Sequence, residues 1–393
     1  MSRKLPLIGY PLRWSDWCLA WRGLVDAGVR ERFGRDLAAW AGKESAFLLN
    51  SGSAAFLLIL RSLCRLSSRR EVLLPCYTAP SLVVAIRKAG LEPACCDISS
   101  DDLNADADDL LRRVNGRTLA VVGVHMFGIP WTAAAMLRQR LPRDVFFIED
   151  AAQAFGATIG GRPVGAFGDA SFYSFNRGKN LPVYAGGCAL TSDARIGALL
   201  REAWMGLKGP GLGEYADVVV KLGGLCLAFK PGVYGLLSRW IARYKETSVP
   251  LDIPQAHLTG FQAAFGRRLL ASSQRTFSAR RSNAAALMQG LSDIPGVRLP
   301  RWTSEAHPVL NRLPVVIEET AYVPNVIDRL EGRGIEASRL YVRPLHRIFD
   351  IAGGEAFPNA EYLAQRLVTL PVHPLVTPGD IEVMIEVIRE QLK

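Results

Sequence analysis

The pattern of hydrophobic positions predicts a series of buried strands separated by helices. Continuous apolar runs bounded by charged or turn residues are typical of strands that are buried on both faces. Helical patterns lie between these runs, and this alternation requires parallel pairing because parallel strands need long crossover connections. The sequence therefore predicts an α/β fold built on a large, doubly wound, mostly parallel sheet. The predicted strands are Glu71–Leu74, Glu92–Asp97, Leu119–His125 and Val145–Glu149.

Candidate chemistry lies between Asp150 and Lys179. Asp150 ends an apolar run, so its carboxylate is expected at the carboxyl end of a strand, where open α/β sheets bind ligands. A further predicted strand over 171–175 delivers Ser174, and Lys179 follows it on a turn. An amine held in a pocket can form a Schiff base with an aldehyde, and a buried carboxylate can keep a pyridine nitrogen protonated. Alone, such an aspartate is usually a cap or turn residue and such a lysine is usually solvated, but their order together favours a site for pyridoxal phosphate (PLP).

A phosphate site is expected where a short apolar strand meets a small-residue turn. The helix that follows would place the backbone amides of Gly52, Ser53 and Ala54 in its first turn. Unpaired amides and the helix dipole favour a dianion at that position. An ordinary serine N-cap is the alternative interpretation. We expect the hydroxyl of Ser174 at the same phosphate.

Four short motifs follow one another in the middle of the chain. They are Ile148-Glu-Asp-Ala-Ala-Gln-Ala-Phe-Gly156, Gly165-Ala-Phe-Gly-Asp169, Ser174-Phe-x-x-x-Lys179-Asn-Leu181 and Gly186-Gly187. Each motif alone is weak, but in order and spacing they resemble the DegT/DnrJ/EryC1/StrS family of sugar aminotransferases. The resemblance covers roughly residues 30–205 and 258–393. It implies a fold-type I PLP enzyme with a smaller C-terminal α+β domain.

The resemblance also implies roles for single residues. Tyr77 corresponds to an aromatic residue that lies on the pyridine ring, although it could simply fill the core. Gln153 resembles the glutamine that the family places beside the ring. Phe155 replaces a histidine that is common at its position, so the role of that histidine is not expected here.

A homodimer is expected because the family completes its active site with a segment of the partner subunit. That segment carries Asn and Arg in the family, whereas this chain has Gln255 and His257 at the corresponding positions. We expect these two residues to be weak substitutes in a contact with the partner's phosphate.

Length and pattern predict two domains, because 393 residues exceed what one hydrophobic core usually supports. The first is a large PLP-binding domain over 1–257, with an atypical insertion at about 206–257. The second, over 258–393, is a linker helix from about Leu258 through Leu291 followed by a small C-terminal domain.

Composition bears on the binding partners and the cellular location that we expect. Seven cysteines lie mostly in apolar runs without a CxxC pair, and no signal peptide is apparent, so we expect a cytoplasmic protein with reduced thiols. Five histidines without metal-ligand spacing predict no metal. The formal charge of +10 favours an anionic partner such as a nucleotide diphosphate. No helix-turn-helix or RNA-binding signature supports nucleic acid as that partner.

The stretch over 218–245 is unusually apolar and basic. Its run from Leu222 to Phe229 is too short to span a bilayer. A basic amphipathic helix could instead lie peripherally on a membrane and meet a lipid-linked substrate, or it could pack over the active site or the dimer seam. The apolar face of that helix would comprise Val233, Leu236, Leu237, Trp240, Ile241 and Tyr244.

The predicted function is that of a PLP-dependent aminotransferase, with Lys179 and Asp150 as its catalytic residues. The expected reaction moves an amino group from glutamate to a keto group of a nucleotide-linked sugar. Lys179 argues against dehydration, because the dehydrating relatives carry histidine at this position. A cyclitol, a keto-acyl compound or a lipid-linked sugar stays open as the acceptor. The non-enzymatic alternative is a PLP-binding regulator, although no DNA-binding segment accompanies the motifs.

Overall fold

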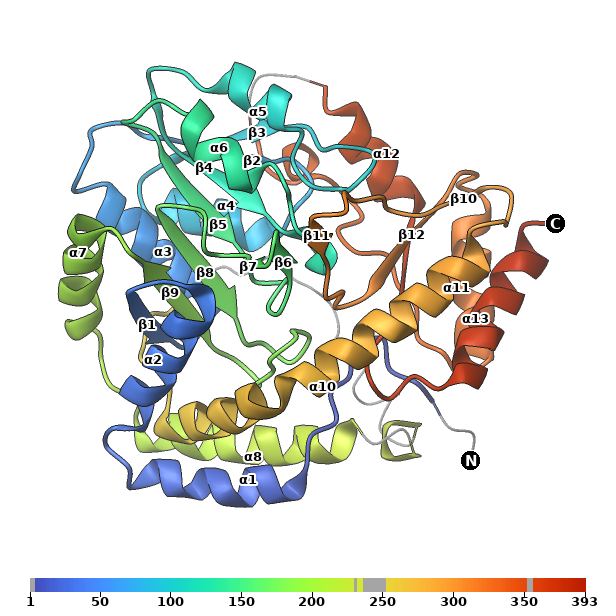
Figure 1. Cartoon of the computed structure of the whole chain (residues 1–393), viewed down its shortest axis with the longest axis horizontal. Helices are drawn as coiled ribbons and strands as arrows, with labels where there is room; N and C mark the ends of the chain where they lie inside the picture. Colours follow the sequence, from blue (N-terminus) through green and yellow to red (C-terminus); the bar gives the residue numbers. More distant parts are fainter. Residues whose placement is uncertain (1–3, 230–231, 236–251, 352–355) are drawn as a thin grey trace.

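A seven-stranded sheet forms the centre of the larger part of the molecule (Figure 1). The computed structural model describes residues 4–229, 232–235, 252–351 and 356–393. The strand order is β1-β9-β8-β5-β4-β2-β3, with parallel pairing from β8 through β3 and antiparallel pairing of β9 and β1. The predicted mostly parallel sheet is confirmed. The strands are β1 Ser45–Leu49, β2 Glu71–Pro75, β3 Glu92–Cys96, β4 Thr118–Val124, β5 Phe146–Asp150, β8 Ala170–Ser174 and β9 Gly187–Thr191.

Helices cover both faces of this sheet because successive side chains of each strand point to opposite faces. In β2, Val72 and Leu74 belong to the core cluster on one face, whereas Leu73 belongs to the cluster on the other. Each face therefore has its own hydrophobic core, as a doubly wound sheet requires. The first core includes α3 Gly52–Leu63, α4 Pro80–Lys88 and α7 Ala194–Met205, and the second includes α2 Val29–Ala41, α5 Ala107–Arg113 and α6 Ala134–Arg140.

The predicted linker helix is confirmed as α10, Gly260–Leu291, which crosses the molecule in Figure 1. It begins with a capping box, in which Thr259 accepts from the amide of Gln262 and the Gln262 side chain accepts from the amide of Thr259. Near its centre Arg280 is buried and donates to three backbone carbonyls, including that of Gly9. Burial lowers the pKa of Arg280 to about 10.

Smaller sheets and helices follow α10. One three-stranded sheet has the order β10-β12-β13, whereas β11 pairs with β6 of the earlier part of the chain. The division of the chain at 257/258 stays a prediction. The remaining strands are β6 Thr158–Ile159, β7 Arg162–Pro163, β10 Val297–Arg298, β11 Ala306–His307, β12 Leu313–Ile317 and β13 Leu367–Leu370. The helices of this part are α11 Tyr322–Gly332, η3 Leu345–Arg347, α12 Pro358–Arg366 and α13 Pro378–Gln391, and the 3-10 turn η2 Met126–Gly128 follows β4.

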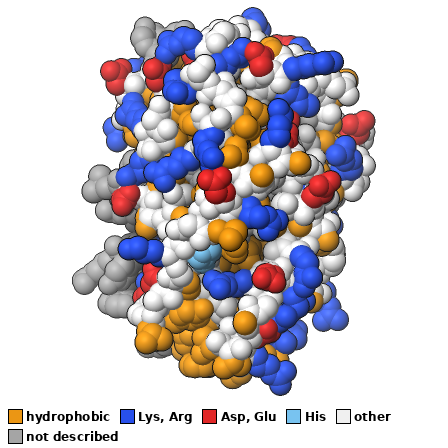
Figure 2. Space-filling model, turned by 90° about the vertical axis from the view of Figure 1, so that its left-hand side faces the viewer, with side chains coloured by type: hydrophobic (Ala, Val, Ile, Leu, Met, Phe, Trp, Pro, Cys, Tyr) orange, Lys and Arg blue, Asp and Glu red, His pale blue; other side chains and the backbone are white. Residues whose placement is uncertain are grey.

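An apolar surface lies where the N-terminal helix meets the predicted insertion. The indole of Trp17 in α1 (Trp14–Ala20) donates to the carbonyl of Val219 in α8 (Leu212–Ala228). Figure 2 shows apolar side chains gathered at this lower end of the molecule and Lys and Arg side chains over much of the same face. The exposed apolar residues of these elements, of the adjoining η1 (Trp21–Leu24) and of the residue after it are Trp14, Trp21, Leu24, Val25, Leu212, Val220 and Leu227.

The structure describes only part of the predicted amphipathic face. Val233 is described, whereas Leu236, Leu237, Trp240, Ile241 and Tyr244 lie outside the described residues. The hydroxyl of the neighbouring Tyr234 donates to the carboxylate of Glu336 at 2.5 Å, so this end of the insertion packs against the C-terminal part. Within the described ranges, none of the helices combines the length and the apolarity needed to cross a bilayer. Peripheral membrane contact through 218–245 stays a prediction.

Gly128 combines a backbone conformation that disfavours side chains with surroundings that leave no room for one. Its φ is +90°, and an added Cβ would lie 2.2 Å from the carbonyl oxygen of Val309. We therefore expect Gly128→Ala to lower the free energy of unfolding by about 3 kcal/mol, measured by denaturant unfolding. Gly160→Ala is the matched control, because Gly160 has φ +53° and no atom within 4 Å of its Cβ position. The control should cost only about 1 kcal/mol, and equal losses would contradict the steric explanation.

Candidate active site

Asp150 lies at the carboxyl end of β5, as predicted, opposite Val124 at the end of β4 and Phe172 in the middle of β8. Its carbonyl accepts from the amide of His125 at 3.0 Å, and its Oδ1 accepts from the amide of Ala152 at 2.9 Å. Burial raises the pKa of Asp150, while the Ala152 amide and the positive charge of Lys179 act in the opposite direction. The Ala152 amide and Lys179 thus favour the charged form of this buried carboxylate.

Lys179 lies in the loop after β8, and its amine is held near that carboxylate. Burial lowers the pKa of Lys179 to about 8, the charge of Asp150 opposes this shift, and Arg312 adds to it. The next residue, Asn180, is buried and donates to the carbonyls of Phe155 and Val309 at 3.1 and 2.8 Å. The lysine thus precedes a fixed backbone position and has an amine that can be neutral near physiological pH.

The first turn of α3 and Ser174 meet where the phosphate was predicted. A Cβ on Gly52 would lie 2.8 Å from the Cβ of Ser174, so these residues are in direct contact. Ser51 is the N-cap and its hydroxyl accepts from the amide of Ala54 at 3.0 Å. Of the three predicted amides, those of Gly52 and Ser53 are therefore left for an anion, since the first amides of a helix have no intrahelical acceptor.

Gln153 and Tyr77 form the wall of the site together with Tyr341, which the sequence did not single out. The amide nitrogen of Gln153 donates to the Tyr341 hydroxyl at 3.5 Å. The ring of Tyr341 stands edge-on to that of Tyr77 with centroids 5.7 Å apart. Tyr77 is fully buried, and its hydroxyl donates to the carbonyl of Leu340. Stacking of Tyr77 on a cofactor ring stays a prediction.

Arg312 and Asn311 are two further polar residues that sequence reasoning missed. Asn311 donates to the side-chain oxygen of Gln153 at 3.3 Å. The Nε of Arg312 is buried and, in the part of the chain that the structure describes, has no hydrogen-bond partner. Burial lowers the pKa of Arg312, whereas the neighbouring Tyr341 raises it. No motif marks these residues, because they reach the site from the C-terminal part across more than a hundred residues.

Glu149, on the opposite face of β5 from Asp150, holds the loop before β8. Its carboxylate accepts from the ring of His125 at 3.0 Å and from the amides of Gly165, Phe167 and Gly168 at 2.8, 2.6 and 2.6 Å. These contacts lower the pKa of Glu149 although its burial acts to raise it. The motif from Gly165 to Asp169 therefore supports the strand that carries Asp150.

The segment expected to reach a partner subunit packs against its own chain. Gln255 accepts from Arg61 at 2.6 Å and donates to the carbonyl of Ala54 at 3.2 Å. The backbone of His257 forms an isolated antiparallel β-bridge with that of Leu49, and the His257 ring stands edge-on to that of Trp204. Both residues thus lie beside the start of α3, and the cross-subunit contact stays a prediction.

Phe155 replaces the family's histidine with a core residue. Its ring is buried, stacks on Trp40 with centroids 5.4 Å apart and meets the ring of Tyr173 edge-on at 5.0 Å. The side chain therefore stabilises an aromatic cluster behind the site and offers it no polar group.

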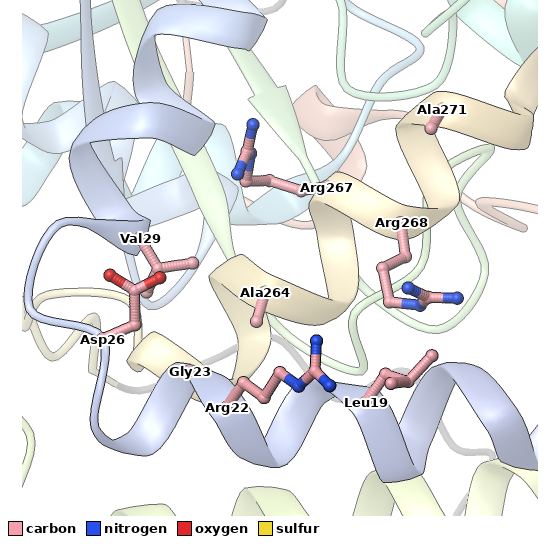
Figure 3. Close-up of a pocket in the computed structure, with 9 residues that line it drawn as sticks. All are labelled: Leu19, Arg22, Gly23, Asp26, Val29, Ala264, Arg267, Arg268 and Ala271. Carbon is pink, nitrogen blue, oxygen red and sulfur yellow. The ribbon is translucent and has the colours of Figure 1, made fainter.

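A separate pocket of about 390 Å³ lies between the N-terminal helices and α10 (Figure 3). None of the predicted site residues lines it. Two of its arginines are paired outside the pocket, Arg267 with Asp36 and Arg268 with Asp16. With its positive charges largely neutralised, this pocket is not the candidate active site.

A model of the DegT/DnrJ/EryC1/StrS aminotransferase family matches residues 24–222 and 238–389. The chain belongs to this family. The unmatched residues between these ranges lie inside the predicted insertion. The chain is thus a PLP-dependent, fold-type I enzyme of a sugar aminotransferase family that acts on nucleotide sugars and includes some dehydratases.

Named relatives include both kinds of enzyme. A dTDP-4-dehydro-2,6-dideoxy-D-glucose 3-dehydratase of Saccharopolyspora spinosa is 27% identical over 388 residues, covering 93% of this chain and 81% of the relative. A dTDP-3-amino-3,4,6-trideoxy-alpha-D-glucose transaminase of Streptomyces venezuelae is 27% identical over 366 residues, covering 92% and 86%. The crystal structure of S. venezuelae DesV superposes with a TM-score of 0.79 at 25% identity, covering 100% of this chain and 99% of that one.

The residues present fit PLP. A buried amine with a pKa of about 8 lies near a buried carboxylate, and two helix-terminal amides lie beside the hydroxyl of Ser174. Lys179 would hold the aldehyde carbon, Asp150 the ring nitrogen, and Gly52, Ser53 and Ser174 the phosphate. The orphaned Nε of Arg312 offers one more donor for a bound anion.

Asp150 tests the electrostatic part of this site. Asp150→Asn should retain PLP, because the phosphate contacts persist, but its turnover should fall by about 10²-fold or more because a preorganised charge is lost. Asp144→Asn is the control, since Asp144 precedes the same strand and is paired with Arg69 at the surface. Steady-state turnover at saturating cofactor measures both variants. Parental turnover in Asp150→Asn would refute the role.

Lys179 should titrate near pH 8 in the cofactor-free protein. Its amine is protonated below that pH and neutral above it, so acetylation by a limiting reagent should rise with pH through a midpoint near 8. In Asp150→Asn the midpoint should move to lower pH, because the charge that favours protonation is gone. Mass spectrometry of the Lys179 peptide gives the profile. A midpoint that stays fixed in Asp150→Asn would contradict the proposed coupling.

Proposed function

We propose that this protein transfers an amino group from glutamate to a keto group of a nucleotide-linked sugar. The observation that carries the proposal is the pair formed by Lys179 and Asp150 at the ends of adjoining parallel strands, where each charge moves the other's pKa. Relatives named as sugar-nucleotide aminotransferases support the acceptor class. They include a UDP-N-acetyl-3-dehydro-alpha-D-glucosamine 3-aminotransferase that is 27% identical over 345 residues.

The chain supplies orientation and proton transfer. PLP, when bound, supplies an electron sink that stabilises negative charge on the carbon next to the amino nitrogen. Asp150 would keep a proton on the ring nitrogen, because its carboxylate is buried and accepts from the amide of Ala152 through Oδ1. The Nζ of Lys179 would take up and return the proton that moves during the transfer, since its pKa of about 8 leaves both forms accessible at neutral pH.

Dehydration is the second candidate reaction, since a dehydratase is among the relatives at the same level of identity. Lys179 favours amination, because an amine can both hold the cofactor and move the proton. We infer that the acceptor is a nucleotide sugar and keep a cyclitol, a keto-acyl compound and a lipid-linked sugar as alternatives within the same chemistry.

We also infer that the enzyme acts as a homodimer. The segment from Ile253 to His257 lies beside the first turn of α3, so a partner bound over this surface would meet the phosphate site. This inference rests on the family's use of the same segment, with Gln255 and His257 as the residues available here.

Transfer of labelled nitrogen tests the proposal. The purified enzyme is incubated with PLP, ¹⁵N-glutamate and one acceptor from a panel of dTDP-, UDP- and GDP-linked keto sugars, a keto cyclitol and a lipid-linked keto sugar. We expect ¹⁵N in a nucleotide sugar, with equimolar 2-oxoglutarate, detected by mass spectrometry. A product that has lost water without gaining nitrogen would establish the dehydratase alternative instead.

A matched pair of lysine variants makes this experiment specific. Lys179→Ala should abolish transfer, and borohydride should link PLP to the peptide that contains residue 179 in the parent but not in this variant. Lys208→Ala, at an exposed lysine, should keep both transfer and the label on Lys179. Normal turnover by Lys179→Ala, or a label on Lys208, would sink the assignment.

A further inference from the structure

A cysteine, a histidine and a glutamate form a hydrogen-bonded row that leads from the core to the surface. Cys76 directly follows β2 and is buried, and its Sγ lies 3.0 Å from Nδ1 of His346. Nε2 of His346 lies 2.9 Å from the carboxylate of Glu361, whose side chain is 32% exposed. A carboxylate can only accept from Nε2, so the free electron pair of the ring faces the thiol. His346 is thus oriented to take the proton of Cys76.

A second thiol lies beside the first. In the pairing of β2 with β3, Leu74 is opposite Cys95, and Cys76 points to the same face as Leu74 because side chains alternate. Cys76 and Cys95 are both buried in the core cluster on that face, and the side-chain interaction with Cys95 lowers the pKa of Cys76. Cys96, the next residue along β3, belongs to the core cluster of the opposite face. Two sulfurs therefore meet on one side of the sheet.

The surroundings favour a thiolate at Cys76. The hydrogen bond from Cys95 lowers the pKa of Cys76 to about 7, with His346 adding to the shift and burial opposing it. The same contact raises the pKa of Cys95. Burial raises the pKa of Cys64, Cys96 and Cys188. Thiolates react far faster than thiols, so the pair consists of one reactive sulfur and one protonated neighbour.

The thiol pair is joined to the active-site wall. The carbonyl of Cys76 accepts from the amide of Leu345 at 2.8 Å, and the next residue, Tyr77, donates to the carbonyl of Leu340. These two contacts hold the loop that carries both Tyr341 and His346. A change at Cys76 would therefore act on the segment that faces Gln153.

We propose that Cys76 is an oxidation-sensitive thiol that reacts with a peroxide, and that Cys95 resolves the product as a reversible disulfide. In the described part of the chain no three His, Cys, Asp or Glu side chains are grouped to hold a metal ion, so the row is better suited to sulfur chemistry. The transaminase chemistry proposed above uses neither cysteine.

The steps balance with hydrogen peroxide as the oxidant. The Cys76 thiolate attacks one peroxide oxygen, the O–O bond breaks, and the departing hydroxide takes the proton held on His346 and leaves as water. The Cys95 sulfur then attacks the sulfur of the resulting sulfenic acid, the S–O bond breaks, and the hydroxide leaves as water with the proton of Cys95. Two sulfurs are oxidised and one peroxide is reduced to two waters.

Formation of the disulfide ends the hydrogen bond between the Cys76 sulfur and His346, because a sulfur bonded to Cys95 is no longer a thiolate that the ring can stabilise. The loop over 340–346 then loses one of its contacts with the turn after β2. A dithiol reductant cleaves the disulfide and so restores the hydrogen-bonded row of Cys76, His346 and Glu361.

Mild peroxide treatment of the PLP-bound protein tests the proposal without any variant. We expect the tryptic peptides that contain Cys76 and Cys95 to become joined, with the loss of two hydrogens and recovery of both free peptides after dithiothreitol. The amide of Leu345 should exchange with deuterium faster in the oxidised protein. Oxidation of other cysteines while Cys76 and Cys95 stay free would overturn the proposal.

Variants separate the roles of the three residues. In Cys95→Ser the disulfide should be absent and dimedone should label Cys76, whereas Cys96→Ser, at the adjacent strand residue, should oxidise like the parent. His346→Gln should slow the reaction of Cys76 with peroxide by about tenfold or more, because the thiolate loses its partner. Arg347→Gln is the control, since Arg347 binds the same carboxylate of Glu361 without being bonded to the sulfur. A parental rate in His346→Gln, or a disulfide that persists in Cys95→Ser, would refute the mechanism.

Discussion

The site depends on a buried carboxylate, that of Asp150, and a buried amine, that of Lys179, each of which favours the charged form of the other. Burial favours the neutral form of both groups, because it raises the pKa of Asp150 and lowers the pKa of Lys179. Each charge opposes that effect on the other, so the two groups form a pair whose protonation is set by their proximity. Parallel strands provide that proximity, because their carboxyl ends lie along one edge of the sheet.

Buried polar groups next to Asp150 and Lys179 hold the backbone segments that carry this pair. Glu149 accepts four hydrogen bonds on the opposite face of β5 and joins His125, at the end of β4, to the loop before β8. The side chain of Asn180, the residue after Lys179, donates to the carbonyls of Phe155 and Val309 in other parts of the chain. These buried hydrogen bonds fix the backbone positions from which Asp150 and Lys179 extend.

Local pattern was sufficient for the elements that bury continuous apolar runs. The strands Glu71–Pro75 and Phe146–Asp150, and the helix Gly260–Leu291, were predicted to within a few residues because their hydrophobic spacing and caps are local signals. The catalytic pair followed from strand ends and motif order. Tyr341 and Arg312 could not be found this way, because they reach the site through tertiary contacts with no sequence signature. The prediction of the phosphate site had a similar limit. The Ser51 hydroxyl accepts from the amide of Ala54, and this local hydrogen bond decides which amides of the first turn stay available to an anion.

The site is therefore shared between two parts of the chain. Gln153 connects them, because its oxygen accepts from the amide of Phe127 at 3.2 Å and from Asn311 at 3.3 Å, while its nitrogen faces Tyr341. Arg280 fixes the same seam from α10 by donating to the carbonyls of Leu310 and Asn311. Because a buried guanidinium is costly to leave unpaired, α10 cannot move relative to this segment without losing those bonds. The long helix thus holds the segment that brings Asn311 and Arg312 to the proposed catalytic pair.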